Sequence, residues 1–208
     1  MAPGTPGGDG AREAARAAAR ARILATARTL FASRGFAACR VADVARQAGM
    51  SPANVYWHFD SKDAILRAIL GEGFANLEAM AAAIADEYGP ARRKLGLLVE
   101  RTLALYEANA EFTVILGGLK GEGGRELIRS LGFDLPEIEG RSRANLRRVF
   151  AEARSERAVE AADPDLLVAF YLAFFDGLLI AHRDLWPALP PDALRDAALR
   201  LVGFRPAG

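Results

Sequence analysis

Near the start of the chain, apolar positions recur every three or four residues, which is the spacing of one face of a helix. The first set of such positions is Ile23, Leu24, Ala27, Leu30 and Phe31. It predicts a helix that runs from residue 11 and stops at Gly35, after a flexible tail rich in glycine and proline over residues 1–10. The next set is Val41, Val44, Ala45 and Ala48. It predicts a second, short helix that ends at Gly49.

A third short helix and a long fourth helix follow. Ser51 and Pro52 supply an N-cap and a first-turn proline for a helix that runs through Phe59. The stripe that marks the fourth helix is Leu66, Leu70, Phe74, Leu77, Ala81 and Ile84. Further helices are predicted over residues 90–109, 111–119, 136–159, 164–186 and 191–202. A glycine-rich stretch at 121–124 closes the second of these, and because no strand alternation is persuasive, the predicted fold class is all-α.

The second and third helices have the residues that a close, steep crossing needs. Ala45 is small enough to leave room, Gly49 suits a tight turn, and Val55 fills the space between the helices. If Val55 and Phe59 face inward, the side chains that point outward are Ser51, Pro52, Ala53, Asn54, Tyr56 and Trp57. Groups able to reach DNA phosphates are carried by Ser51, Tyr56 and Lys62. Asn54 can hydrogen-bond base edges, so the pattern predicts a helix-turn-helix that presents its third helix to DNA.

The distribution of charge favours the same interpretation. The whole chain has a net charge of +1, from 27 basic and 26 acidic residues. Residues 1–62 hold nine basic and four acidic residues, a net charge of +5, whereas the remainder has a net charge of −4. A basic N-terminal module is typical of a protein that binds a polyanion. Arg12, Arg16 and Arg20 follow one another at i, i+4 spacing, which fits contacts to flanking phosphates and fits a solvated helix face equally well.

Several spaced signatures resemble the DNA-binding domain of the TetR family of transcriptional regulators. They lie at residues 22–31, 35–36, 41–45, 48–51, 55–59 and 61–62. The resemblance implies that the third helix enters the major groove of double-stranded operator DNA, while a tyrosine and a lysine hold the backbone. The residues to which it assigns DNA contacts are Ser51, Pro52, Ala53, Asn54, Tyr56, Trp57, His58 and Lys62.

One position departs from the family pattern. The family commonly places Thr or Ser directly before the second helix, where this chain has Cys39 and Arg40. We therefore expect a weakened cap on that helix and altered contacts to the DNA backbone, with Arg40 and Arg46 as the candidate phosphate ligands. The predicted helix-turn-helix DNA-binding domain covers residues 11–64.

Residues 65–208 resemble the family's effector-binding and dimerisation region in architecture. The apolar run at 166–181, which contains Gly177, looks like a helix that pairs with its copy in a homodimer. The resemblance implies a dimer through helices 164–186 and 191–202, although both helices could also be plain core. A pocket among the helices would accept a small apolar or aromatic effector. Its candidate lining residues are Phe74, Tyr106, Phe112, Leu116, Phe150, Phe170, Phe174 and His182.

Residues for catalysis and metal binding are sparse. The chain has two histidines, His58 and His182, and one cysteine, Cys39, without a metal-ligand spacing or a paired acid. We expect no enzyme activity, no metal and no cofactor, and a start without an export signal predicts a cytoplasmic protein without a membrane span. The predicted function is a ligand-responsive repressor that binds a palindromic operator as a dimer and is released by its effector. The alternative is a constitutive helix-turn-helix DNA-binding protein without a small-molecule ligand.

Overall fold

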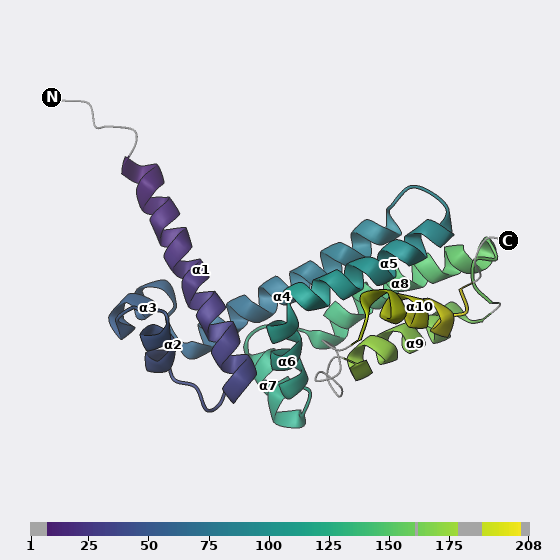
Figure 1. Cartoon of the computed structure of the whole chain (residues 1–208). Coiled ribbons are helices and arrows are strands. Elements are labelled where there is room, and N and C mark those ends of the chain that lie inside the picture. Colours follow the sequence, from purple (N-terminus) through teal and green to yellow (C-terminus); the bar gives the residue numbers. More distant parts are fainter. Residues whose placement is uncertain (1–7, 161, 179–188, 205–208) are drawn as a thin grey trace. The chain divides into compact units, whose positions relative to one another are not determined.

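The computed structural model describes residues 8–160, 162–178 and 189–204, and within them the chain forms α-helices and no β-strand (Figure 1). The predicted all-α fold class is therefore confirmed. The chain divides into two compact units, Met1–Gly71 and Glu72–Gly208. The predicted boundary, after residue 64, lies seven residues earlier than this division.

The N-terminal unit contains α1 (Gly8–Arg34), α2 (Val41–Gln47), α3 (Pro52–His58) and the first turns of α4 (Lys62–Ala85). Helix α1 begins three residues before the predicted start, so residues 8–10 of the predicted tail are helical. The core of this unit includes the predicted stripe on α1 and four residues of α4, which are Ile65, Leu66, Ile69 and Leu70. Because these α4 side chains are buried, the first two turns of α4 belong to this unit.

The C-terminal unit contains the rest of α4 together with α5 (Ala91–Ala108), α6 (Ala110–Gly118), α7 (Glu122–Ser130), α8 (Leu135–Ser155), α9 (Pro164–Asp176) and α10 (Pro191–Leu201). Helix α8 packs on α5 and α9, and α10 packs on α5 and α9 (Figure 1). Their apolar faces meet in one core, whose fully buried members include Leu95, Leu98, Phe150 and Phe175.

One helix was not predicted, and one predicted boundary was wrong. Helix α6 ends at Gly118, before the glycine-rich stretch, as predicted, but Glu122 begins α7, which buries Ile128 and was not predicted. Gly124 is needed there, since a Cβ at this position would meet the backbone oxygen of Leu119 at 2.5 Å. Helix α8 ends at Ser155 rather than at 159, because Arg157 has a φ of 56° and turns the chain out of the helix.

The predicted helix over residues 164–186 lies partly outside the described residues. Helix α9 covers it to Asp176, and residues 177–178 continue as a wider helical turn. Residues 179–188 are not among those described.

Helix α4 is long and apolar enough, by length and composition alone, to cross a membrane. Its apolar side chains have another partner, however. Ile65, Leu66, Ile69 and Leu70 are buried in the N-terminal unit, and Ile84 and Ala85 join the core of the C-terminal unit. Packing inside the protein therefore accounts for the apolar character of α4.

Candidate functional site

Helices α2 and α3 form the predicted helix-turn-helix. The side chains where they cross, Val44, Ala45 and Val55, are at most 1% exposed. Gly49 has a φ of +67°, the left-handed region that favours glycine, and this turn lets the N–H of Met50 donate to the carbonyl oxygen of Ala45 at 2.9 Å. The residue types identified in the sequence thus perform the geometric roles assigned to them.

Helix α3 presents the side chains that were predicted to face outward. Ser51 caps the helix, because its Oγ accepts a hydrogen bond from the backbone N–H of Asn54 at 3.2 Å. The exposed side chains are Ser51, Pro52, Ala53, Asn54, Tyr56 and Trp57. Tyr56 is 52% exposed and Trp57 is 62% exposed, whereas Val55 is fully buried. One face of this short helix is therefore anchored and the other is open to a partner.

His58 differs from the other predicted contact residues because it is half-buried. Its ring lies edge-on to Trp57, with 4.7 Å between the centroids. Burial, followed by the positive charges of Arg16 and Arg20, lowers the pKa of His58 below its usual value. In the free protein the shift favours the neutral imidazole at pH 7, which can donate or accept a hydrogen bond.

The start of α2 shows what replaces the missing hydroxyl cap. The side chain of Arg40 makes no cap hydrogen bond, as an all-donor guanidinium requires. Asp43 instead accepts the backbone N–H of Arg40 at 3.1 Å and also pairs with the guanidinium of Arg46 at 2.8 Å. The side chain of Arg46 is still 75% exposed, and Arg40 is exposed as well, so both remain candidate phosphate ligands.

Cys39 lies just before this helix and is buried, with 2% exposure. Its thiol lies 3.5 Å from the carbonyl oxygen of Leu30, and burial raises the pKa of the thiol above its usual value. These features agree with the interpretation of Cys39 as a small packing residue.

Lys62 has a structural role that the sequence did not indicate. Its ammonium group donates to the carbonyl oxygens of Phe36 at 2.8 Å and Cys39 at 2.9 Å, and it lies 4.1 Å from the centroid of the Phe36 ring. Two of its three N–H groups are thus used to hold the loop between α1 and α2 against the start of α4. A single N–H and the positive charge are left for the predicted phosphate contact.

Replacement of Lys62 should therefore weaken the fold as well as any DNA contact. Lys62→Met removes two hydrogen bonds from a charged donor, and we expect the free energy of unfolding to fall by about 1–2 kcal/mol. Urea denaturation of the full chain measures this change. Arg67→Met is the matched control, because Arg67 is an exposed basic residue on the same helix. A urea midpoint of Lys62→Met equal to that of the wild type would contradict the structural role.

The predicted effector-binding residues fall into two aromatic groups. Phe74 meets Phe112 at 5.7 Å and Phe133 at 5.3 Å between ring centroids. In the second group the rings gather around Tyr171 and Phe175, and the predicted members are Tyr106, Phe150 and Phe174. Leu116 is half-buried on α6.

Two further predicted effector residues join neither group. Phe170 is 44% exposed, because neighbouring residues of a helix point roughly 100° apart and Tyr171 takes the buried direction. The described residues of this chain do not enclose its side chain, and its predicted contact with an effector stays a prediction. His182 lies outside the described residues.

The second aromatic group encloses a polar pair that sequence reasoning missed. The hydroxyl groups of Thr102 and Tyr171 form a short hydrogen bond, and the Tyr171 hydroxyl also lies 3.3 Å from the carbonyl oxygen of Leu98. Burial, followed by the charge of Asp176, raises the pKa of Tyr106, so this phenol is neutral. The spacing could have revealed Thr102, since it continues the buried stripe of Leu95, Leu98 and Val99 on α5.

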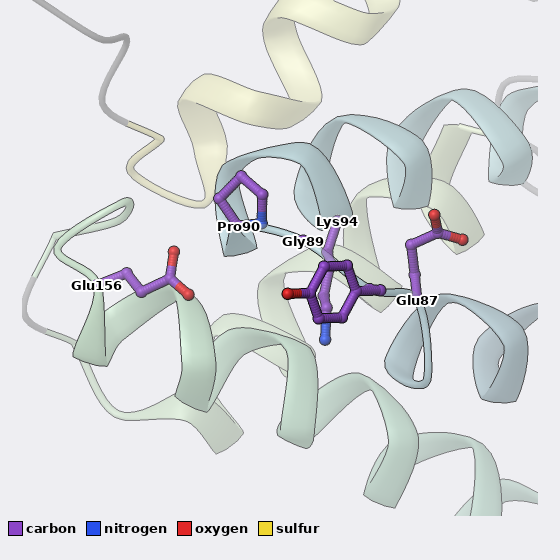
Figure 2. Close-up of a pocket in the computed structure, with 6 residues that line it drawn as sticks. Glu87, Gly89, Pro90, Lys94 and Glu156 are labelled. Carbon is purple, nitrogen blue, oxygen red and sulfur yellow. The ribbon is translucent and has the colours of Figure 1, made fainter.

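Two surface recesses stand out in the described part of the C-terminal unit, and neither is lined by a predicted effector residue. One lies at the loop between α4 and α5, where Figure 2 shows Lys94 between Glu87 and Glu156. Lys94 is 6% exposed and donates to the carbonyl oxygen of Ala85 at 3.2 Å and to Glu152 at 2.6 Å. Its contacts hold the end of α4 to α5 and α8, which is a structural role.

Known proteins resemble this chain in the sequence of its helix-turn-helix and in the fold of most of its length. Residues 23–69 match the family model described as bacterial regulatory proteins, tetR family. Over 71 residues the chain is 41% identical to the HTH-type transcriptional repressor KstR2 of Rhodococcus jostii (strain RHA1). That match covers 32% of this chain and 35% of KstR2, so the chain matches about a third of the length of this relative.

Solved structures extend the similarity beyond the N-terminal unit. The TetR family transcriptional regulator PfmR from Thermus thermophilus superposes with a TM-score of 0.70 at 25% identity, over 91% of this chain and 98% of PfmR. The MbdR regulator from Azoarcus sp. CIB superposes with a TM-score of 0.71 at 20% identity, over 91% of this chain and all of MbdR (100%). The residues that match the tetR family model include the buried crossing of α2 and α3, and the fold of the whole chain resembles that of a TetR family transcriptional regulator.

Proposed function

We propose that the protein is a transcriptional repressor that binds operator DNA through α3 and is released when a small molecule binds in its C-terminal unit. The observation that carries this proposal is the exposed row of polar and aromatic side chains on α3, mounted on a fully buried crossing with α2. The side chain of Asn54 has the donor and acceptor that bind an adenine in the major groove, and Ala53 can contact a thymine methyl. Phosphate contacts would come from Ser51, Tyr56, Arg40, Arg46 and Lys62.

The proposal that the protein acts as a homodimer rests on exposed apolar side chains of two helices. Leu166 and Phe170 on α9 are 47% and 44% exposed, and Leu201 on α10 is 45% exposed. Two copies that bury these faces against each other would form a bundle of four helices. A symmetric dimer offers two copies of α3, which would match a palindromic operator with half-sites one helical turn apart.

The proposed effector is a small apolar or aromatic molecule with at least one hydrogen-bonding group. The aromatic rings around Tyr171 and Phe175 suit its apolar part, and the hydroxyl groups of Thr102, Tyr106 and Tyr171 suit its polar part. The effector would release DNA only as far as it binds one conformation of the protein more tightly than the other. Helix α4 is continuous from Lys62 to Ala85 and carries residues of both cores, so it is the proposed route of the change.

Selection of bound sequences from random double-stranded DNA, followed by gel shifts at two salt concentrations, tests the DNA-binding function. A repressor of this kind should select an inverted repeat and bind it less tightly as salt rises. Failure to enrich any sequence would contradict the proposal. Gel shifts repeated with fractions of small metabolites then separate a ligand-responsive repressor from the constitutive alternative, which no fraction would release.

Substitution of Asn54 tests the assignment of base readout. The Asn54→Ala protein should discriminate less between bases at one base pair in each half-site. The difference in binding free energy between the right and wrong base should fall by about 1–3 kcal/mol, because the bidentate contact to the base is gone. The salt dependence should stay unchanged, since no charge is removed. Competition gel shifts with single-base operator variants measure both quantities. Asn76→Ala, an exposed asparagine on α4, is the control, and an unaltered base preference in Asn54→Ala would refute the assignment.

A further inference from the structure

Two arginines of α1 lie over aromatic rings at the end of α3. The guanidinium carbon of Arg16 is 4.9 Å from the centroid of the Trp57 ring, and that of Arg20 is 4.8 Å from the centroid of the Phe59 ring. The sequence offered two interpretations of this basic stretch, phosphate contacts or a solvated face, and neither included an aromatic partner. The N-terminal turns of α1 therefore contact the helix that is proposed to read DNA.

Trp57 is the residue on which these contacts act most directly. The residue is 62% exposed, so core packing fixes little of it. Arg16 lies over its face, and the imidazole of His58 meets it at an interplanar angle of 88°. A planar guanidinium stacks on an indole better than a lysine ammonium does. The contact with Arg16 therefore attracts the Trp57 ring and also favours one orientation of it.

We propose that Arg16 is a positioning residue, which holds Trp57 in one arrangement on the DNA-binding surface and so contributes to base preference. The proposal rests on the proposed DNA-binding function. A side chain that is ordered before binding loses less conformational entropy when it meets DNA. The neutral state of His58 at pH 7 is compatible with this arrangement, because an imidazolium would repel both guanidinium groups.

The positioning of Trp57 can be measured without DNA. The chain has two tryptophans, so Trp186→Phe leaves Trp57 as the sole tryptophan, and excitation at a wavelength that tyrosine does not absorb reports on it alone. In this background we expect acrylamide, a neutral quencher, to quench Trp57 more effectively in Arg16→Ala and in Arg16→Lys, by up to about 1.6-fold, because the residue is already 62% exposed and loses the guanidinium that covers one face of its ring. Arg22→Ala, an exposed arginine on the same helix, should quench as the parent does. Unchanged quenching in both Arg16 variants would overturn the positioning of Trp57.

Gel shifts with operator DNA distinguish a positioning role of Arg16 from a purely electrostatic one. Arg16→Lys keeps the positive charge, so the salt dependence should match that of the wild type, while discrimination at one operator position falls by about tenfold, as expected when one ordered base contact is lost. If Arg16 acts only as a charge beside the phosphates, Arg16→Lys will retain both the salt dependence and the base preference, and the proposal fails.

A double-mutant cycle measures whether the effect of Arg16 on base preference depends on Trp57. In a Trp57→Leu background, Arg16→Lys should have no further effect on base preference, because the ring on which Arg16 acts is absent. An equal effect in both backgrounds would show that Arg16 acts on DNA directly and would overturn the proposal. Should the wild-type protein select no DNA sequence, the proposed function itself fails, whereas the quenching arm still decides whether Arg16 positions Trp57.

Discussion

Phe170→Asp should convert the proposed homodimer into monomers and reduce operator affinity at least about a hundredfold, because binding by one half-site loses the gain of linked binding. Phe170 and Leu166 form the exposed apolar side of α9, while its other side is buried. Formation of the dimer would bury one carboxylate at position 170 from each copy, and neither would have a cation as a partner. Sedimentation velocity measures the oligomeric state, and gel shifts measure the affinity.

The control for this prediction is Tyr88→Asp. Tyr88 is an aromatic side chain with 95% exposure in the loop between α4 and α5, so the change is chemically similar but lies away from α9. It should leave a dimer with unchanged affinity. Gly177→Arg is a second test, because a Cβ at this position meets nothing within 4 Å among the residues that the structure describes. If Phe170→Asp and Gly177→Arg both sediment as dimers, the interface lies elsewhere.

Gly73→Ala should destabilise the protein by about 1–3 kcal/mol, the typical cost of overpacking a core. A Cβ at Gly73 would overlap the ring of Phe112 on α6. That ring is 5% exposed and packs edge-on against Phe74, so it has little room to move aside. Thermal and urea denaturation of the full chain report the loss.

A second glycine on a helix provides the matched control. Gly96 lies on α5, and a Cβ there meets nothing within 4 Å in the described part of the chain, so Gly96→Ala should be neutral or stabilise by up to about 1 kcal/mol. Combining Gly73→Ala with Phe112→Leu should recover part of the lost stability if the overlap is the cause. Equal stability of Gly73→Ala and Gly96→Ala would mean that α6 yields without cost, which would contradict the prediction.

The helix-turn-helix was largely predictable because its determinants are local in sequence. The determinants are the buried positions Val44, Ala45 and Val55, the turn at Gly49 and the cap at Ser51, and no two of them are more than eleven residues apart. Helical periodicity and capping depend on such short separations, so a single sequence carries them. The sequence did not predict α7, which begins at Glu122, because the glycines at its start are typical of a loop. Burial of Ile128 and the close approach of Gly124 to the end of α6 favour a helix there.

The roles of individual site residues depended on contacts that no periodicity encodes. Lys62 was predicted to bind phosphate, yet its ammonium group bonds to carbonyl oxygens 23 and 26 residues earlier in the chain. The predicted effector residues separated into two groups because Phe74 packs on α6, whereas Tyr106 packs on α9. Composition identifies such residues as aromatic or basic, but it does not give the direction of each side chain.

By itself, the sequence determined that the chain is all-α, where most helices begin and end, and which face of α3 is open, because these properties follow from the periodicity of apolar residues and from local capping. Only the tertiary structure decided which helices pack together, that Phe170 is exposed while Tyr171 is buried, and that Arg16 lies over Trp57. Those outcomes depend on how each helix is rotated against neighbours far away in sequence, and that rotation is set by the packing of the whole core.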